Sequence, residues 1–111
     1  MNLTPKQIIE EKLPTCLTAN PELQKEINAV ILFDIKGENG GKWILDLTKN
    51  SDWLINNTEE VTPQITVGML DSDFIGMITR TFHIQGLAMG GKIKMKPVNS
   101  NVMQLLKLLM V

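Results

Sequence analysis

Apolar and polar side chains alternate in several segments of the chain, and this period of two constrains the fold most. The alternation is strict between Lys92 and Lys96, where Ile93 and Met95 separate three lysines. The same period runs through residues 27–35 and 65–69. Because successive side chains of a strand point to opposite faces, such segments form strands with one apolar and one wetted face. The sequence therefore predicts a one-sided sheet whose apolar face a second layer must cover.

The N-terminal segment predicts a helix. Thr4 and Gln7 have the spacing of a capping box, with Pro5 at the first helical position. We expect Pro14 to end this helix, because a proline inside a helix removes a backbone donor. Residues 20–25 are expected to form a second short turn or helix.

Further strands and helices follow. A glycine-rich hairpin at residues 37–41 leads into an apolar strand through Trp43, Leu45 and Leu47, and residues 53–55 add a short strand. Asp71 or Ser72 is expected to cap a helix. Two more helices are expected within residues 81–89 and 99–110. Residues 56–60 are expected to form a polar loop, and Lys92 to Lys96 form the last strand.

Short loops between neighbouring strands favour a mostly antiparallel sheet. Covered by helices on one face, this sheet gives a two-layer α+β fold. The 111 residues fit a single domain.

Composition narrows the classes of function. The formal net charge is −1 and no basic run is present, so no nucleic acid partner is expected. Cys16 is the only cysteine, which excludes an internal disulfide and a thiolate metal framework. No signal-peptide pattern, membrane-spanning stretch or C-terminal peroxisomal tripeptide is apparent, so we expect a cytoplasmic protein.

The sequence gives little indication of a catalytic site. His83 is the only histidine, and Cys16 has no activating base near it in the sequence. Residues 86–92 have the spacing of a phosphate loop, but a helix precedes them and a strand follows, the reverse of the required order. Asp71 and Asp73 are interpreted as groups at a helix start rather than as a catalytic pair. We therefore expect no enzyme activity, no metal and no cofactor.

The last helix is the most informative segment, because most of its residues between Val102 and Met110 are apolar. A helix of this kind must be buried on several sides. It either belongs to an ordinary core, packs on a partner or another copy, or roofs a cavity that holds a ligand. The seven methionines of the chain favour adaptable apolar space.

In this order and spacing, the segments resemble the sterol carrier protein type 2 domain family over nearly the whole chain. The resemblance rests on residues 27–33 with the hairpin after them, residues 41–43, residues 65–74, residues 91–95 and the leucine-rich C-terminal helix. It implies a five-stranded sheet covered by about five helices, with an apolar tunnel between them. It also implies binding and intracellular transfer of a fatty acid, acyl-CoA, sterol or phospholipid, without catalytic residues.

The predicted lining of this tunnel consists of apolar residues from strands and helices. They are Phe33, Trp43, Leu45, Ile65, Val67, Phe74, Ile78, Phe82, Met95, Met103, Leu106 and Leu109. Expected partners are an apolar lipid and, transiently, a membrane surface, with the protein a monomer or weak dimer. The alternative is a non-catalytic interaction or oligomerisation module whose C-terminal helix packs on a partner.

Overall fold

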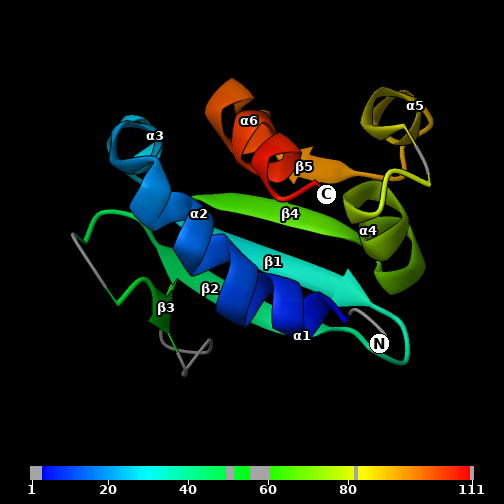
Figure 1. The fold of residues 1–111 in the computed structure, drawn as a ribbon, viewed down its shortest axis with the longest axis horizontal. Coiled ribbons are helices and arrows are strands. Elements are labelled where there is room, and N and C mark those ends of the chain that lie inside the picture. Colours follow the sequence, from blue (N-terminus) through cyan, green and yellow to red (C-terminus); the bar gives the residue numbers. More distant parts are fainter. Residues whose placement is uncertain (1–3, 50–51, 56–60, 82, 111) are drawn as a thin grey trace.

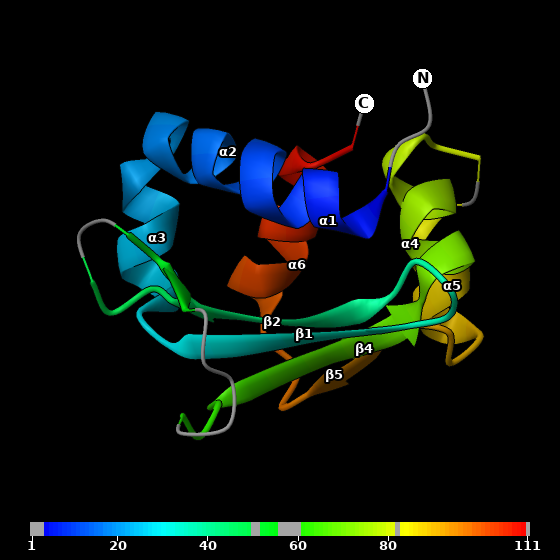
Figure 2. The ribbon, with the colours of Figure 1, turned by 90° about the horizontal axis from the view of Figure 1, so that it is seen from below.

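The fold consists of one sheet with helices packed on one of its faces (Figures 1 and 2). The computed structural model describes residues 4–49, 52–55, 61–81 and 83–110. Its elements are α1 (Pro5–Gln7), a π-helical turn η1 (Ile8–Lys12), α2 (Leu13–Ala19), α3 (Pro21–Ile27), β1 (Val30–Lys36), β2 (Gly41–Asp46), β3 (Leu54–Ile55), β4 (Ile65–Leu70), α4 (Asp71–Ile78), α5 (Ile84–Met89), β5 (Lys94–Lys96) and α6 (Ser100–Leu108). The predicted two-layer α+β fold is confirmed. The expected loop at residues 56–60 lies outside the described residues.

The sheet has five strands in the order β3-β2-β1-β4-β5. Three of its four pairings are antiparallel, but the central pair, β1 with β4, is parallel. The sheet is therefore mixed, because the chain crosses from the β3 edge to the far side of β1 before β4 begins. The lengths of the connections explain why the sheet is not wholly antiparallel, because only the β1–β2 connection is short enough to act as a tight hairpin.

The apolar core lies between the sheet and the helices. Ile31, Phe33 and Ile35 of β1 are at most 2% exposed, as their alternation predicts. Ile27 is buried too, but as the last residue of α3 rather than in the strand. Asn28 follows it in the left-handed conformation, with φ of 40°, which ends the helix two residues before β1.

The N-terminal helical segments form one continuous rod that crosses the sheet (Figure 1). The predicted capping box is present, with Gln7 N–H donating to Thr4 Oγ1 at 3.3 Å and Thr4 N–H donating to Gln7 Oε1 at 3.1 Å. The prediction that Pro14 ends the helix is wrong. The chain widens to a π turn in which Leu13 N–H donates to Ile8 O, and α2 continues through Pro14. The widened turn accommodates a proline that has no amide hydrogen of its own.

Asp71 ties the β1–β2 hairpin to the start of α4. Its carboxylate accepts from Asn39 N–H at 3.0 Å and from the adjacent Ser72 N–H at 2.8 Å. The prediction that Asp71 or Ser72 caps the helix is wrong, because Leu70 is the N-cap residue and no side chain caps it. Asp71 instead joins two segments that are distant in the sequence.

This contact predicts a strong effect at Gly37. A Cβ atom there would overlap the Asp71 carboxylate, and the φ of Gly37 is +118°. Gly37→Ala is therefore expected to lower the free energy of unfolding by more than about 1 kcal/mol. In the matched control Gly86→Ala, the new Cβ meets only His83 Cβ, at 3.9 Å within α5. The control is expected to raise stability by about 0.5–1 kcal/mol in urea unfolding. Equal effects would contradict this assignment.

The C-terminal helix α6 is capped by Asn99, whose side chain accepts from Asn101 N–H and Val102 N–H. Its residues Val102, Leu105 and Leu106 are fully buried. The helix predicted within residues 81–89 begins only at Ile84. Among the described residues, no helix has both the length and the apolar character that a membrane crossing requires.

Candidate functional site

The residues predicted to line a tunnel gather in the core between the sheet and the helices. Trp43 and Met103 are half-buried and pack against the core, and Phe82 lies outside the described residues. The other nine are at most 8% exposed. They are Phe33, Leu45, Ile65, Val67, Phe74, Ile78, Met95, Leu106 and Leu109. The sequence therefore identified residues that share one apolar interior.

The strand register arranges four of these residues in one row. Phe33 lies opposite Trp43 on β2 and beside Val67 on β4, and Val67 lies opposite Met95 on β5. The row crosses the sheet on the face that carries the core. Trp43 Nε1 donates to Glu10 Oε2 at 3.0 Å, so its indole is also held by the π turn above it.

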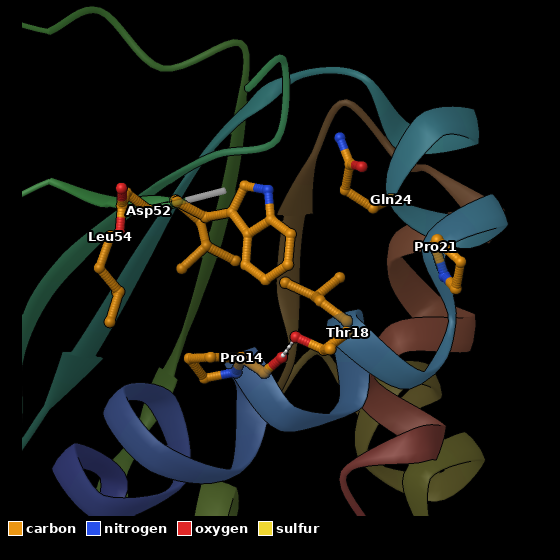
Figure 3. A pocket seen from close by; sticks show the side chains of 9 residues that line it. Pro14, Thr18, Pro21, Gln24, Asp52 and Leu54 are labelled. Atoms are coloured by element: carbon orange, nitrogen blue, oxygen red, sulfur yellow. Dashed lines mark hydrogen bonds between the residues drawn. The ribbon is translucent and has the colours of Figure 1, made fainter. Parts of the chain in front are cut away.

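A groove with a volume of about 590 Å³ opens beside this core, between α2, α3 and the β3 edge of the sheet (Figure 3). We call it the α2–β3 groove. Pro14 and Thr18 come from α2, and Asp52 and Leu54 lie across from them (Figure 3). Its full lining is Pro14, Leu17, Thr18, Pro21, Gln24, Leu45, Asp52, Trp53 and Leu54. The volume falls within the usual range for small-molecule sites, about 300–1,000 Å³.

Hydrogen bonds fix the wall of the groove. Gln24, which is 6% exposed, donates through Nε2 to Leu47 O and, at 3.0 Å, to Lys49 O. Trp53 Nε1 donates to the same Lys49 carbonyl at 2.9 Å. The turn after β2 is thereby tied to α3 on one side and to the Trp53 indole on the other. With its N–H satisfied, the indole contributes mainly apolar surface to the groove.

The groove meets the core at two residues. Leu17 and Leu45 are each 1% exposed, belong to the core and also line the groove. Trp43 is the next residue on the same face of β2. The groove therefore lies next to the row that holds Trp43 and Phe33, with Leu45 between them on the same face of β2.

Among the twelve predicted lining residues, Leu45 alone lines the α2–β3 groove in the part of the chain that the structure describes. The sequence prediction missed Leu17, Trp53 and Leu54, and also the two prolines of the rim. Trp53 and Leu54 belong to the apolar segment 53–55 that was predicted as a short strand, of which only Leu54 and Ile55 form β3. A strand of two residues buries little by itself, so large side chains there were a signal for a second apolar surface.

The segment at residues 86–92 forms the predicted helix-to-strand turn. Gly91 has a φ of +73°, Lys92 N–H donates to Leu87 O at 2.8 Å, and Gly91 N–H donates to Ala88 O at 3.2 Å. This is the Schellman arrangement that closes a helix C-terminus. Because both amide groups already donate within the chain, they are not free to hold a phosphate.

The other reactive side chains are dispersed. His83 is exposed at the start of α5, and Cys16 is half-buried with its Sγ 3.6 Å from Leu108 O. Within the described ranges, no group of three or more histidine, cysteine or acidic residues is arranged to hold a metal ion. The described geometry thus offers apolar surface rather than reactive groups.

A one-sided mixed sheet, an apolar core and a groove that opens onto it define a small α+β domain suited to apolar ligands. A model of the SCP-2 sterol transfer family matches residues 9–110. The chain therefore belongs to this family, as its sequence pattern indicated.

Two curated proteins share part of the sequence. The chain is 34% identical over 74 residues to peroxisomal multifunctional enzyme A of Dictyostelium discoideum, covering 66% of this chain and 17% of that protein. It is 29% identical over 75 residues to hydroxysteroid dehydrogenase-like protein 2 of Pongo abelii, covering 68% of this chain and 18% of that protein. The matched segment is thus less than a fifth of either relative.

Solved structures share the fold. The NMR structure of palmitated SCP2L2 from Aedes aegypti has a TM-score of 0.70 at 19% identity, covering 96% of this chain and 95% of that one. Apo sterol carrier protein 2 from Yarrowia lipolytica has a TM-score of 0.65 at 24% identity, covering 92% and 89%.

Proposed function

We propose that this chain binds an apolar lipid, with the tail entering the core through the α2–β3 groove, and carries it between sites. The observation that carries the proposal is that Leu17 and Leu45 belong both to the lining of the groove and to the apolar core. Membership of a sterol transfer family supports it. The tunnel lining is proposed to include the predicted core residues and the newly found groove residues.

The energy of binding comes from the tail. Each buried methylene contributes about 0.8 kcal/mol, so a tail of about 12 methylenes gains roughly 10 kcal/mol before the costs of association. Micromolar or tighter affinity then needs no charged anchor. Among the described residues that line the groove, Asp52 alone is charged, and none is a cation. A fatty acid, acyl-CoA, sterol or phospholipid would therefore be selected by its apolar part more than by its head group.

Lipid binding is tested on the purified protein by native mass spectrometry, followed by removal of lipid and titration with a fluorescent fatty acid. We expect co-purified lipid masses and a saturable titration with one site and a Kd of about 1 μM or lower. A protein that is free of lipid and gives no saturable signal would contradict the proposal.

The alternative is an interaction module that packs on a partner through α6. It has less support, because the apolar side chains of this helix are already buried within the chain. The side chains of Val102, Leu105, Leu106 and Leu109 are 0% exposed and pack into the chain's own core. Light scattering distinguishes the two hypotheses. We expect a monomer or weak dimer that binds lipid, whereas a stable dimer without lipid would favour the module. We propose no reaction for this chain.

A further inference from the structure

The polar side chains that line the α2–β3 groove have already used their hydrogen-bond donors. Among the described residues of the lining, those with a polar side chain are Thr18, Gln24, Asp52 and Trp53. Thr18 Oγ1 donates to Pro14 O at 2.9 Å, and Trp53 Nε1 donates to Lys49 O at 2.9 Å. The carboxylate of Asp52 only accepts hydrogen bonds. The groove therefore presents acceptors to a ligand, provided that the amide of Gln24 does the same.

Two backbone carbonyls orient the Gln24 amide. Its Nε2 donates to Leu47 O and to Lys49 O, and an amide NH₂ group has two hydrogens, so both donors are used. The carbonyls also fix which end of the amide is nitrogen, because an oxygen in that position would face two other acceptors. Oε1 is left as an acceptor to which no described residue donates.

This oxygen is accessible from the groove. Gln24 is 6% exposed, and among the described residues every fully enclosed side-chain nitrogen or oxygen has a hydrogen-bond partner. Oε1 has no such partner, so it is not fully enclosed. The opening that Gln24 lines is the α2–β3 groove, where it lies on the α3 side, with Asp52 and Leu54 across from it (Figure 3). A ligand in the groove can therefore reach Oε1.

A structural role accounts for only half of this amide. The bonds from Nε2 tie α3 to the turn after β2, and a lysine or arginine side chain would also supply donors for them. Neither of those side chains would leave an acceptor in the groove. An acceptor that a ligand shields from water costs free energy unless the ligand donates to it. The free oxygen of Gln24 thus favours ligands that carry a donor.

We propose, on the basis that lipid binds in the groove as described above, that Gln24 Oε1 accepts a hydrogen bond from the hydroxyl of a long-chain alcohol. A carboxylate or phosphate would bring only acceptors to Oε1 and Asp52, and no cation in the described lining would offset its charge. An ammonium group could donate, but burial beside Gln24 would remove its hydration. The tail still supplies most of the affinity, and Gln24 determines which head group is preferred.

The first test compares three ligands on the wild-type chain by displacement of the fluorescent fatty acid. Hexadecanol and methyl pentadecyl ether are isomers of which only the alcohol has an O–H, and palmitate has the chain length of hexadecanol with an anionic head. We expect hexadecanol to bind about fivefold more tightly than either, since one net hydrogen bond contributes about this factor. Equal Kd values for the two isomers would overturn the role of Gln24 and leave lipid binding in place. A chain that binds neither the probe nor the three ligands would overturn the proposed function as well.

Two substitutions test whether the preference comes from Gln24. Gln24→Met removes the acceptor, and Gln24→Lys removes it while keeping donors for the carbonyls of Leu47 and Lys49. We expect hexadecanol and the ether to bind about equally in both variants, and we expect palmitate to bind more tightly than hexadecanol in Gln24→Lys. Because the ligands are compared within one variant, a loosened groove wall would weaken the binding of both isomers alike.

The matched control is Gln85→Lys, which adds the same charge at an exposed position of α5 outside the groove. It should keep the wild-type order of the three ligands. If either Gln24 variant kept the wild-type preference for hexadecanol over the ether, the proposal would be overturned. A preference for palmitate in Gln85→Lys would also overturn it, because the effect would then not depend on the groove.

Discussion

Thr18→Trp is expected to weaken lipid binding strongly while leaving the fold intact. Thr18 lines the α2–β3 groove, is exposed, and donates through Oγ1 to Pro14 O at 2.9 Å (Figure 3). An indole at this position would fill part of the space proposed for the tail. Displacing about three methylenes costs about 2.4 kcal/mol, so the Kd of a fluorescent fatty acid should rise roughly 50-fold.

The same helix offers a matched control in Thr15. Thr15 is also exposed and donates through Oγ1 to a carbonyl one turn earlier, that of Glu11, but it does not line the groove. Thr15→Trp should therefore keep the Kd of the wild type. If both variants bound lipid equally well, the tail would not pass through the groove.

Leu106→Ala is expected to have the largest effect on stability. Leu106 is 0% exposed within the core, so its truncation removes buried apolar surface and leaves a cavity. We expect a loss of about 2–5 kcal/mol in the free energy of unfolding, measured in urea. Leu106→Glu should be still more damaging, because it would bury an unpaired carboxylate. Loss of lipid binding in Leu106→Glu would therefore report unfolding rather than contact with the ligand.

Gln104→Ala provides the control on the same helix. Gln104 is exposed, so its replacement should change stability by less than about 0.5 kcal/mol. A cost below about 1 kcal/mol for Leu106→Ala would contradict the packed core described for α6. In that case the side chain would border open space.

Local patterns predicted most of the fold. The capping box at Thr4 and the alternation of buried and exposed side chains in residues 31–35 depend on neighbours within a few residues, and these predictions were confirmed. The alternation in residues 92–96 is also present, but the strand predicted there is shorter, because β5 begins only at Lys94. The predictions were wrong where contacts between residues that are distant in the sequence determine the structure. Pro14 remains inside a helix because a π turn accommodates it, and Asp71 bonds to Asn39 rather than capping α4. The parallel β1–β4 pair depends on a crossover that no local pattern specifies.

The site was less predictable for the same reason. Alternation identifies side chains that face the core, so it found the row of Phe33, Val67 and Met95. It does not reveal where the core opens to solvent. The groove forms where α2, α3 and β3 meet, and the position of its wall depends on Gln24, which bonds to carbonyls more than twenty residues away.

The two tryptophans of the chain allow a direct test of lipid binding through the groove. Trp53 lines the groove, and Trp43 lies deeper on the same sheet, beside Phe33. With 5-fluorotryptophan incorporated, titration with a long-chain fatty acid is followed by fluorine NMR, and Trp43→Phe and Trp53→Phe assign the two signals. We predict that both signals shift and saturate together at one equivalent of lipid. A shift of Trp43 with Trp53 unchanged, or no shift of either, would contradict the proposed path.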